Sequence, residues 1–217
     1  MNDAVAIRTI TDGAATITLG LTAHQRYENP ALANNGAGVF TAGIGANNGD
    51  PTFATTPSLT LGSTWNFAWS LSVQNGTLSD YTFDLLYDFD ASVGTDQSAL
   101  GAIHLSSGFF AQQDTQNLLF DFLNGSTITG ALAAGAGATT PPAGSFNPNA
   151  VGEYSFALIA YKSGGELGRS AILVDTVAST SGAAGVPEGG ATVTLMLFGF
   201  AALVGFQLWQ RHVKRVI

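Results

Sequence analysis

Apolar and polar residues alternate in two stretches of this chain, 65–73 and 81–89. The odd positions are apolar in both, and Asn66, Ser70 and Ser72 occupy even positions of the first. A period of two is typical of a strand with one buried face. Asn75 and Gly76 lie between the stretches and form a strong turn signal. We therefore predict that the two strands pair as a hairpin, with a loop longer than two residues.

Weaker strand patterns follow along the chain, and Gly and Pro separate them. The candidate strands are 15–22, 58–61, 100–105, 117–123, 152–161 and 171–177. Two segments rich in Gly, Ala, Asn and Thr, 28–57 and 129–150, are predicted to be surface loops. No window before residue 190 has convincing helical periodicity. Seven or eight short strands favour an all-β body, a β-sandwich or jelly roll.

The pattern changes near the C-terminus, where residues 191–209 contain no charged side chain. A helix of that length spans roughly 28 Å, close to the ~30 Å hydrocarbon core of a membrane. The basic residues Arg211, Lys214 and Arg215 follow directly. Cationic flanks stay on the cytoplasmic side, so we predict one transmembrane helix with the body outside. The alternative, a buried helix of a soluble domain, would need a polar stripe.

Charge and composition exclude some partners and some kinds of site. Residues 1–188 hold all fifteen acidic residues but only four of the seven basic ones, a formal charge of −11. Nucleic acid is excluded as a partner, because phosphate binding needs a basic face. The chain has no Cys, which excludes a disulfide scaffold and a thiolate metal site.

The predicted organisation is an exodomain (1–178), a linker (179–190), the transmembrane helix (191–209) and a basic cytoplasmic tail (210–217).

An exported body needs an export signal, but residues 1–20 have neither a basic start nor an uninterrupted apolar run. Three explanations stay open: a misassigned start, a leader that this chain lacks, or another export route. We favour the second explanation, that this chain lacks its leader.

Candidate chemistry is sparse, and each candidate has a structural alternative. Four aspartates, which could supply oxygen ligands to Ca²⁺, lie close together in sequence: Asp84, Asp88, Asp90 and Asp96. The EF-hand pattern is absent, and Asp84 and Asp88 occupy even strand positions, so we expect them to point to water. No cofactor is expected.

The alternating aromatic row, Trp65, Phe67, Trp69 and Tyr81, could form a platform for sugar rings. An alternating aromatic face is more often core. We therefore predict that the row is buried between two sheets, together with Leu71, Phe83, Leu85, Tyr87, Phe156 and Leu158.

Immediately before the apolar span stand Val186, Pro187, Glu188, Gly189 and Gly190. Followed by one apolar span and a basic terminus, this sequence resembles a PEP-CTERM sorting signal, and most closely its VPDSG variant. It departs from that variant in Glu for Asp and in Gly for Ser. The resemblance covers residues 186–217. It implies export in a bacterium that makes extracellular polysaccharide, and recognition of Val186–Gly190 by a membrane transpeptidase of the exosortase type.

The expected function is a non-enzymatic protein of the cell envelope or extracellular matrix, anchored in the membrane and, after processing, released to the cell surface or matrix. Its expected partners are the exosortase-type enzyme and membrane lipid, with extracellular polysaccharide as a further candidate. The alternative is a carbohydrate-binding module or a degraded hydrolase on the same anchor. Burial of Trp65 and Trp69 would remove the best support for that alternative.

Overall fold

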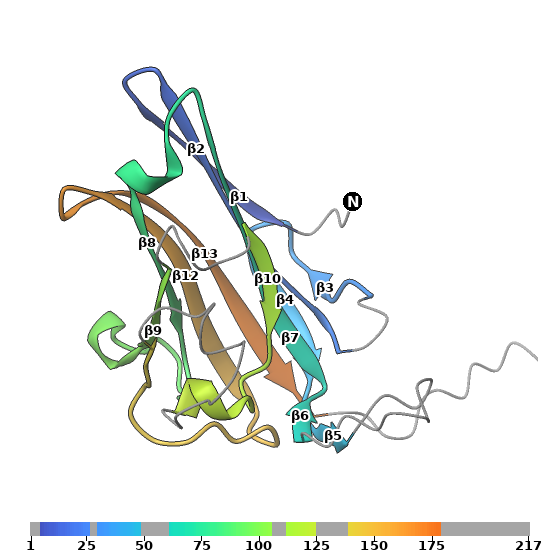
Figure 1. The fold of residues 1–217 in the computed structure, drawn as a ribbon. Coiled ribbons are helices and arrows are strands. Elements are labelled where there is room, and N and C mark those ends of the chain that lie inside the picture. Colours follow the sequence, from blue (N-terminus) through green and yellow to red (C-terminus); the bar gives the residue numbers. More distant parts are fainter. Residues whose placement is uncertain (1–4, 27–29, 49–60, 106–111, 125–138, 179–217) are drawn as a thin grey trace, which may run out of the picture. The chain divides into compact units, whose positions relative to one another are not determined.

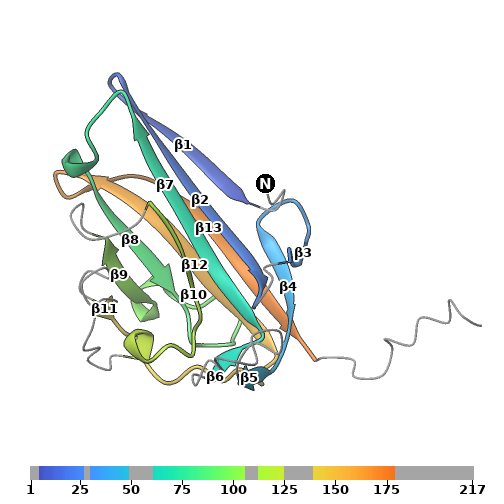
Figure 2. The same ribbon diagram turned by 45° about the vertical axis from the view of Figure 1, so that its right-hand side comes forward.

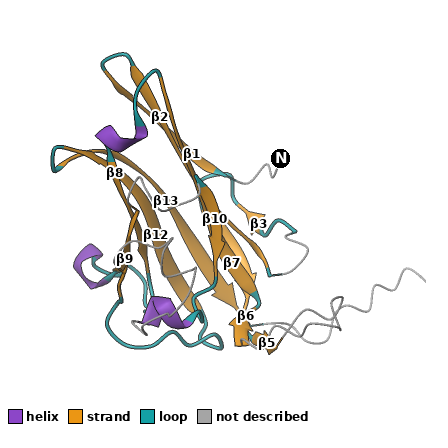
Figure 3. Ribbon diagram, in the orientation of Figure 1, coloured by secondary structure: helices purple, strands orange, loops and turns teal. Residues whose placement is uncertain are grey.

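The computed structural model describes residues 5–26, 30–48, 61–105, 112–124 and 139–178, and the all-β prediction is confirmed over them (Figure 3). The strands are β1 (Ala6–Asp12), β2 (Ala15–Gln25), β3 (Ala33–Asn34), β4 (Val39–Gly43), β5 (Ala46–Asn48), β6 (Leu61–Ser63), β7 (Trp65–Gln74), β8 (Thr82–Tyr87), β9 (Gly101–Leu105), β10 (Gln113–Gln116), β11 (Thr139–Thr140), β12 (Gly152–Lys162) and β13 (Gly165–Val177). Short 3₁₀ helices lie at Leu78–Asp80, Gln97–Ala99 and Asp121–Asn124.

Two sheets face each other and form a sandwich (Figures 1 and 2). The four-stranded sheet has the order β1-β2-β7-β10, and the seven-stranded sheet has the order β11-β9-β8-β12-β13-β4-β3. β5 and β6 form a separate pair. The described strand pairs are antiparallel except for β13 and β4, which run parallel. β13 therefore lies inside the larger sheet, between β12 and β4.

The core between the sheets is aromatic, as the alternation predicts. All ten residues predicted to be buried are at most 5% exposed: Trp65, Phe67, Trp69, Leu71, Tyr81, Phe83, Leu85, Tyr87, Phe156 and Leu158. The rings of Phe67 on β7 and Phe156 on β12 meet across the core with centroids 4.7 Å apart. Each large side chain removed from water contributes about 1.5–3 kcal/mol, so this contact region is a main source of stability.

The predicted hairpin between 65–73 and 81–89 is wrong. β7 belongs to the four-stranded sheet and β8 to the seven-stranded one, so the segment between them crosses from sheet to sheet. Asn75 has a φ of +53° and makes the turn, and a 3₁₀ helix at Leu78–Asp80 completes the crossing. Tight hairpins occur elsewhere. β12 and β13 join through Ser163 and Gly164, whose φ angles of +50° and +79° suit a type I′ turn.

Four of the six weaker strand predictions correspond to strands of the structure. The strands predicted at 15–22, 100–105, 152–161 and 171–177 correspond to β2, β9, β12 and β13. Most of 58–61 lies outside the described residues. The predicted loop 28–57 contains β3, β4 and β5, because Phe40 and Ala42 of β4 are buried against the core.

The strand predicted at 117–123 is wrong, because the segment forms a turn and a 3₁₀ helix around the buried Asn117. The Asn117 amide oxygen accepts from the backbone N–H groups of Ser63 (2.9 Å) and Leu119 (3.1 Å). Its amide nitrogen donates to the carbonyls of Ser63 and Trp65, at 3.1 and 3.0 Å, and to the Asn66 side chain. Asn117 therefore joins its own turn to β6 and β7.

At the hairpin end of the sandwich, Asp12 holds three segments together. Its carboxylate accepts from Lys162 at the end of β12 and from the Tyr81 hydroxyl before β8, the latter at 2.9 Å. The hydrogen bond from Lys162, and then that from Tyr81, lower the pKa of Asp12 below its usual value. The ionised form of Asp12 is thus favoured by folding.

Candidate functional site

The aromatic row predicted from the alternation is core and not a platform. Trp65 and Trp69 are buried, and the Trp65 ring lies 5.9 Å from that of Tyr154 and 6.0 Å from that of Phe156. A sugar ring cannot reach these faces while the core is packed. The carbohydrate-binding alternative therefore loses its predicted surface.

The structure separates the four aspartates proposed as calcium ligands. Asp84 lies on the outer face of β8 and bonds to His104, whereas Asp88, Asp90 and Asp96 lie in the loop after β8. Within the described part of the chain, no three His, Cys, Asp or Glu side chains are arranged to hold a metal ion.

The expectation that Asp88 points to water is wrong, since only 1% of it is exposed. β8 ends at Tyr87, so the alternation that placed Asp88 outside stops one residue before it. The Asp88 carboxylate accepts from the backbone N–H groups of Asp90 (2.9 Å) and Ser155 (3.3 Å). Burial raises its pKa above the usual range, although these hydrogen bonds oppose the shift. Asp88 thus fixes the loop to β12.

Asp90 and Asp96 have local structural roles in the same loop. Asp90 accepts from the backbone N–H of Ser92, and Asp96 accepts from both the N–H and the hydroxyl of Ser98. These hydrogen bonds, from Ser92 and Ser98 respectively, lower the pKa of each carboxyl group. Asp96 also caps the 3₁₀ helix Gln97–Ala99. Their carboxylates are therefore committed to backbone turns.

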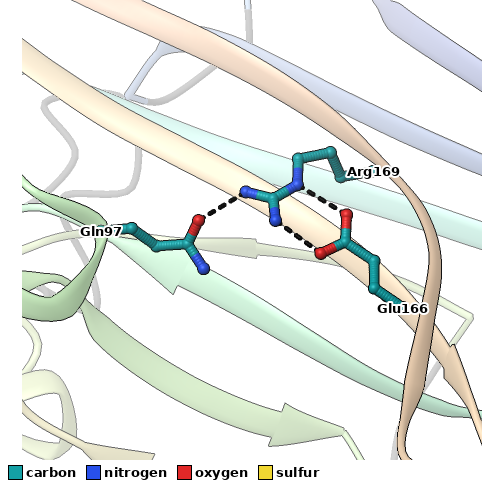
Figure 4. A network of polar contacts seen from close by, with 3 residues as sticks. All are labelled: Gln97, Glu166 and Arg169. Atoms are coloured by element: carbon teal, nitrogen blue, oxygen red, sulfur yellow. Dashed lines mark hydrogen bonds and ion pairs between the residues drawn. The ribbon is translucent and has the colours of Figure 1, made fainter.

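That 3₁₀ helix is tied to the outer face of the seven-stranded sheet (Figure 4). The guanidinium group of Arg169 on β13 donates two hydrogen bonds to Glu166 and a third to the amide oxygen of Gln97, the last at 2.6 Å. The same face carries a small apolar cluster of Leu86, Ala157 and Ile159, and Ile159 is fully buried. An outward-facing Ile on a sheet is buried only when something covers it. Leu100, Ala102 and Tyr161 pack against the cluster and provide that cover.

Beside this cluster the outer face is hollowed, over a volume of about 460 Å³. We call this the Tyr161 hollow, and it is lined by Thr82, Phe83, Asp84, His104, Leu105, Tyr161 and Gly164. The strand register explains the composition. Asp84 is paired with His104 on β9 and with Ile159 on β12, and Thr82 is paired with Tyr161. Outward positions of three neighbouring strands therefore meet here.

A hydrogen bond joins the two titratable side chains of the hollow. Nδ1 of His104 lies 2.7 Å from Oδ1 of Asp84, and the side chains are 50% and 24% exposed. An ionised carboxylate only accepts, so a neutral His104 carries its proton on Nδ1 and keeps Nε2 as an acceptor. Burial, followed by the charges of Asp84 and Glu166, raises the pKa of Tyr161. Its hydroxyl stays protonated and can donate.

The sequence did not reveal this group of residues. The alternation predicts only that Asp84 faces solvent, and His104 stands alone in sequence with no metal-binding spacing. The signal that could have found the pair is the outward position of both residues on strands that adjoin in the sheet. That signal requires the β8–β9 register, which the sequence alone does not specify.

The residues predicted for sorting, Val186, Pro187, Glu188, Gly189 and Gly190, lie outside the described residues. The same is true of the apolar span and of Arg211, Lys214 and Arg215. Over the described ranges, none of the helices has the length and apolar character to cross a membrane.

No family model matches the chain, and neither a curated protein nor a solved structure matches it.

Proposed function

We propose that this chain is a non-enzymatic protein of the cell envelope or extracellular matrix whose C-terminus is a sorting and processing signal. In this proposal an exosortase-type membrane transpeptidase recognises Val186–Gly190, the helix 191–209 anchors the chain in membrane lipid, and the body lies outside the cytoplasm. One observation carries the proposal: the motif, the uncharged span and the basic residues occur in that order within the last 32 residues.

The described body and the linker sequence are compatible with this separation into a folded body and a C-terminal signal. The described core cluster draws all its members from residues 10–174, and β13 ends at Val177. The last described strand of the body thus ends before the linker begins. The small residues of the linker, 179–185, favour access of a protease to the motif.

The test compares the wild-type chain with a Pro187→Ala, Glu188→Ala double variant in a bacterium that carries the sorting enzyme. Intact mass of the recovered protein is the readout. The wild type should lose the mass of its tail, and the variant should keep it, because a protease cleft binds specific side chains. A Thr180→Ala, Ser181→Ala variant is the matched control, since it changes the linker but not the motif, and it should be cut like the wild type.

Two results would contradict the proposal. If the Pro187→Ala, Glu188→Ala variant is shortened as efficiently as the wild type, recognition does not use these residues. If the wild type keeps its full mass in the host that carries the enzyme, the tail is an anchor and not a processing signal.

A further inference from the structure

The Tyr161 hollow combines an aromatic ring with groups that bind hydroxyls. Tyr161 packs against the apolar cluster formed by Leu86, Ala157 and Ile159, and the residue also lines the hollow. A ring held in this way loses little conformational freedom when a ligand stacks on it. The volume of about 460 Å³ falls within the ~300–1,000 Å³ of small-ligand sites.

The polar groups of the hollow match a ligand with several hydroxyls. Asp84 accepts hydrogen bonds, Nε2 of a neutral His104 accepts, and the hydroxyl groups of Thr82 and Tyr161 both donate and accept. Asp84 and His104 come from adjoining strands and orient each other through their 2.7 Å contact. A pair of neighbouring hydroxyls can donate to Asp84 and His104 while the apolar face of the same ligand lies on Tyr161. A sugar ring presents this combination, with C–H groups on its faces and hydroxyls around its edge.

The charges around the hollow favour a neutral ligand. Asp84 is hydrogen-bonded to His104, and Glu166, the cross-strand neighbour of Tyr161, is paired with Arg169. Lys162 is paired with Asp12. Arg169 and Lys162 therefore already have carboxylate partners, and residues 1–188 carry a formal charge of −11. An anionic polymer would be repelled at this surface.

We propose that the Tyr161 hollow binds a sugar ring of a neutral polysaccharide, with Tyr161 stacking on the ring and Asp84 and His104 accepting from its hydroxyls. This site lies on the outer face of the seven-stranded sheet and is distinct from the buried row of Trp65 and Trp69. It deepens the proposed function by naming a matrix partner, but it does not depend on processing of the tail.

The test is affinity electrophoresis of the full-length chain in lauryldimethylamine oxide, a detergent without a sugar headgroup. Native gels contain dextran, pullulan, galactomannan, xyloglucan or mixed-linkage β-glucan. At least one polysaccharide should retard the wild type. Tyr161→Ala should raise the apparent Kd about tenfold or more, because stacking is lost, and Tyr161→Phe should bind nearly as the wild type. Asp84→Asn, which keeps the side-chain shape, should also weaken binding.

The matched control is Ile7→Ala on β1, which changes a 67% exposed apolar residue of the other sheet and should leave retardation unchanged. Tryptophan fluorescence confirms that each variant is folded, and Asp84→Asn decides the outcome if Tyr161→Ala is not. The proposal is overturned if no polysaccharide retards the wild type, or if Asp84→Asn and a folded Tyr161→Ala variant bind unchanged. It is also overturned if retardation vanishes in 0.5 M NaCl, since contact with a neutral ligand is not screened by salt.

Failure here and failure of the proposed function are distinguishable. Tail cleavage is measured by mass and needs no sugar, whereas gel retardation needs no sorting enzyme.

Discussion

Asn117 offers the sharpest test of how the sandwich is held together. It is fully buried, and five hydrogen bonds connect its amide to the turn that follows it and to β6 and β7. Replacement by Ala removes all five. The most affected residue is Ser63, which is also fully buried and uses both its backbone N–H and its carbonyl to bond Asn117.

The expected cost follows from counting the groups that lose their partner. A buried polar group left without a hydrogen bond costs about 1–3 kcal/mol. The Ser63 N–H and carbonyl together give about 2–6 kcal/mol. The Trp65 carbonyl adds little, because it also accepts from the Ser63 hydroxyl at 2.6 Å. Since a domain is stable by only ~5–15 kcal/mol, Asn117→Ala should unfold a large part of the population at 37 °C or lower the urea midpoint strongly.

Asn117→Asp tests the direction of these bonds. The carboxylate can still accept from Ser63 and Leu119, but it would face the carbonyls of Ser63 and Trp65 and the Asn66 side-chain oxygen. Burial and this repulsion raise the folded-state pKa of the new carboxyl group above its unfolded value of ~3.9. The destabilisation is therefore fully present at neutral pH and shrinks as the pH falls through the folded-state pKa.

Urea unfolding followed by tryptophan fluorescence measures both effects, because Trp65 is buried next to this network. Asn124→Ala is the matched control. Asn124 is exposed, and its side-chain amide donates to the Phe120 carbonyl at 3.4 Å, so truncation should cost less than about 0.5 kcal/mol. The reasoning is refuted if Asn117→Ala costs less than 1 kcal/mol, or if Asn117→Asp is as stable as the wild type at pH 7.

Three further predictions concern other parts of the chain. Phe83→Ala should cost about 3–5 kcal/mol by opening a cavity in the core, whereas Val93→Ala at an exposed position should be nearly neutral in the same urea experiment. The wild type should be more stable than Asp12→Asn at pH 7. Because folding lowers the pKa of Asp12 below its usual value of 3.8, the difference in urea midpoint should shrink and disappear as the pH falls below 3.8 and through the lowered pKa. A difference that persists at low pH would contradict this. A Leu197→Arg, Ala201→Arg double variant should leave the membrane fraction, at roughly 2.5–3.5 kcal/mol per Arg, and unchanged fractionation would rule out a spanning helix.

The sequence predicted strands and buried faces better than it predicted their partners. β7 and β8 both direct their odd positions to the core, and that pattern is the same whether two strands pair in one sheet or face each other from opposite sheets. The Asn75–Gly76 turn signal is local and reports a reversal, not the sheet that the chain enters next. Pairing is decided by contacts such as that between Phe67 and Phe156, which are distant in sequence.

Side-chain hydrogen bonds explain the other errors. The apolar residues of 117–123 suggested a strand, but the Asn117 amide replaces the regular backbone pairing there. The alternation of β8, continued by one residue, predicts that Asp88 faces solvent, yet the Asp88 carboxylate is buried and accepts from two backbone N–H groups. The Asp84–His104 pair depends on sheet register in the same way. Patterns of hydropathy carry no information about which polar side chain satisfies which backbone group.

The position of β13 has a mechanical consequence. β13 is the last described strand, it ends at Val177, and it is hydrogen-bonded to β12 on one side and to β4 on the other. A pull on the C-terminal end of the body, along the strand, would load both ladders in shear. Many hydrogen bonds would then have to break at once, whereas an edge strand peeled from its end gives way one bond at a time. A body tethered through its C-terminus would resist drag best with the tether attached to such a strand.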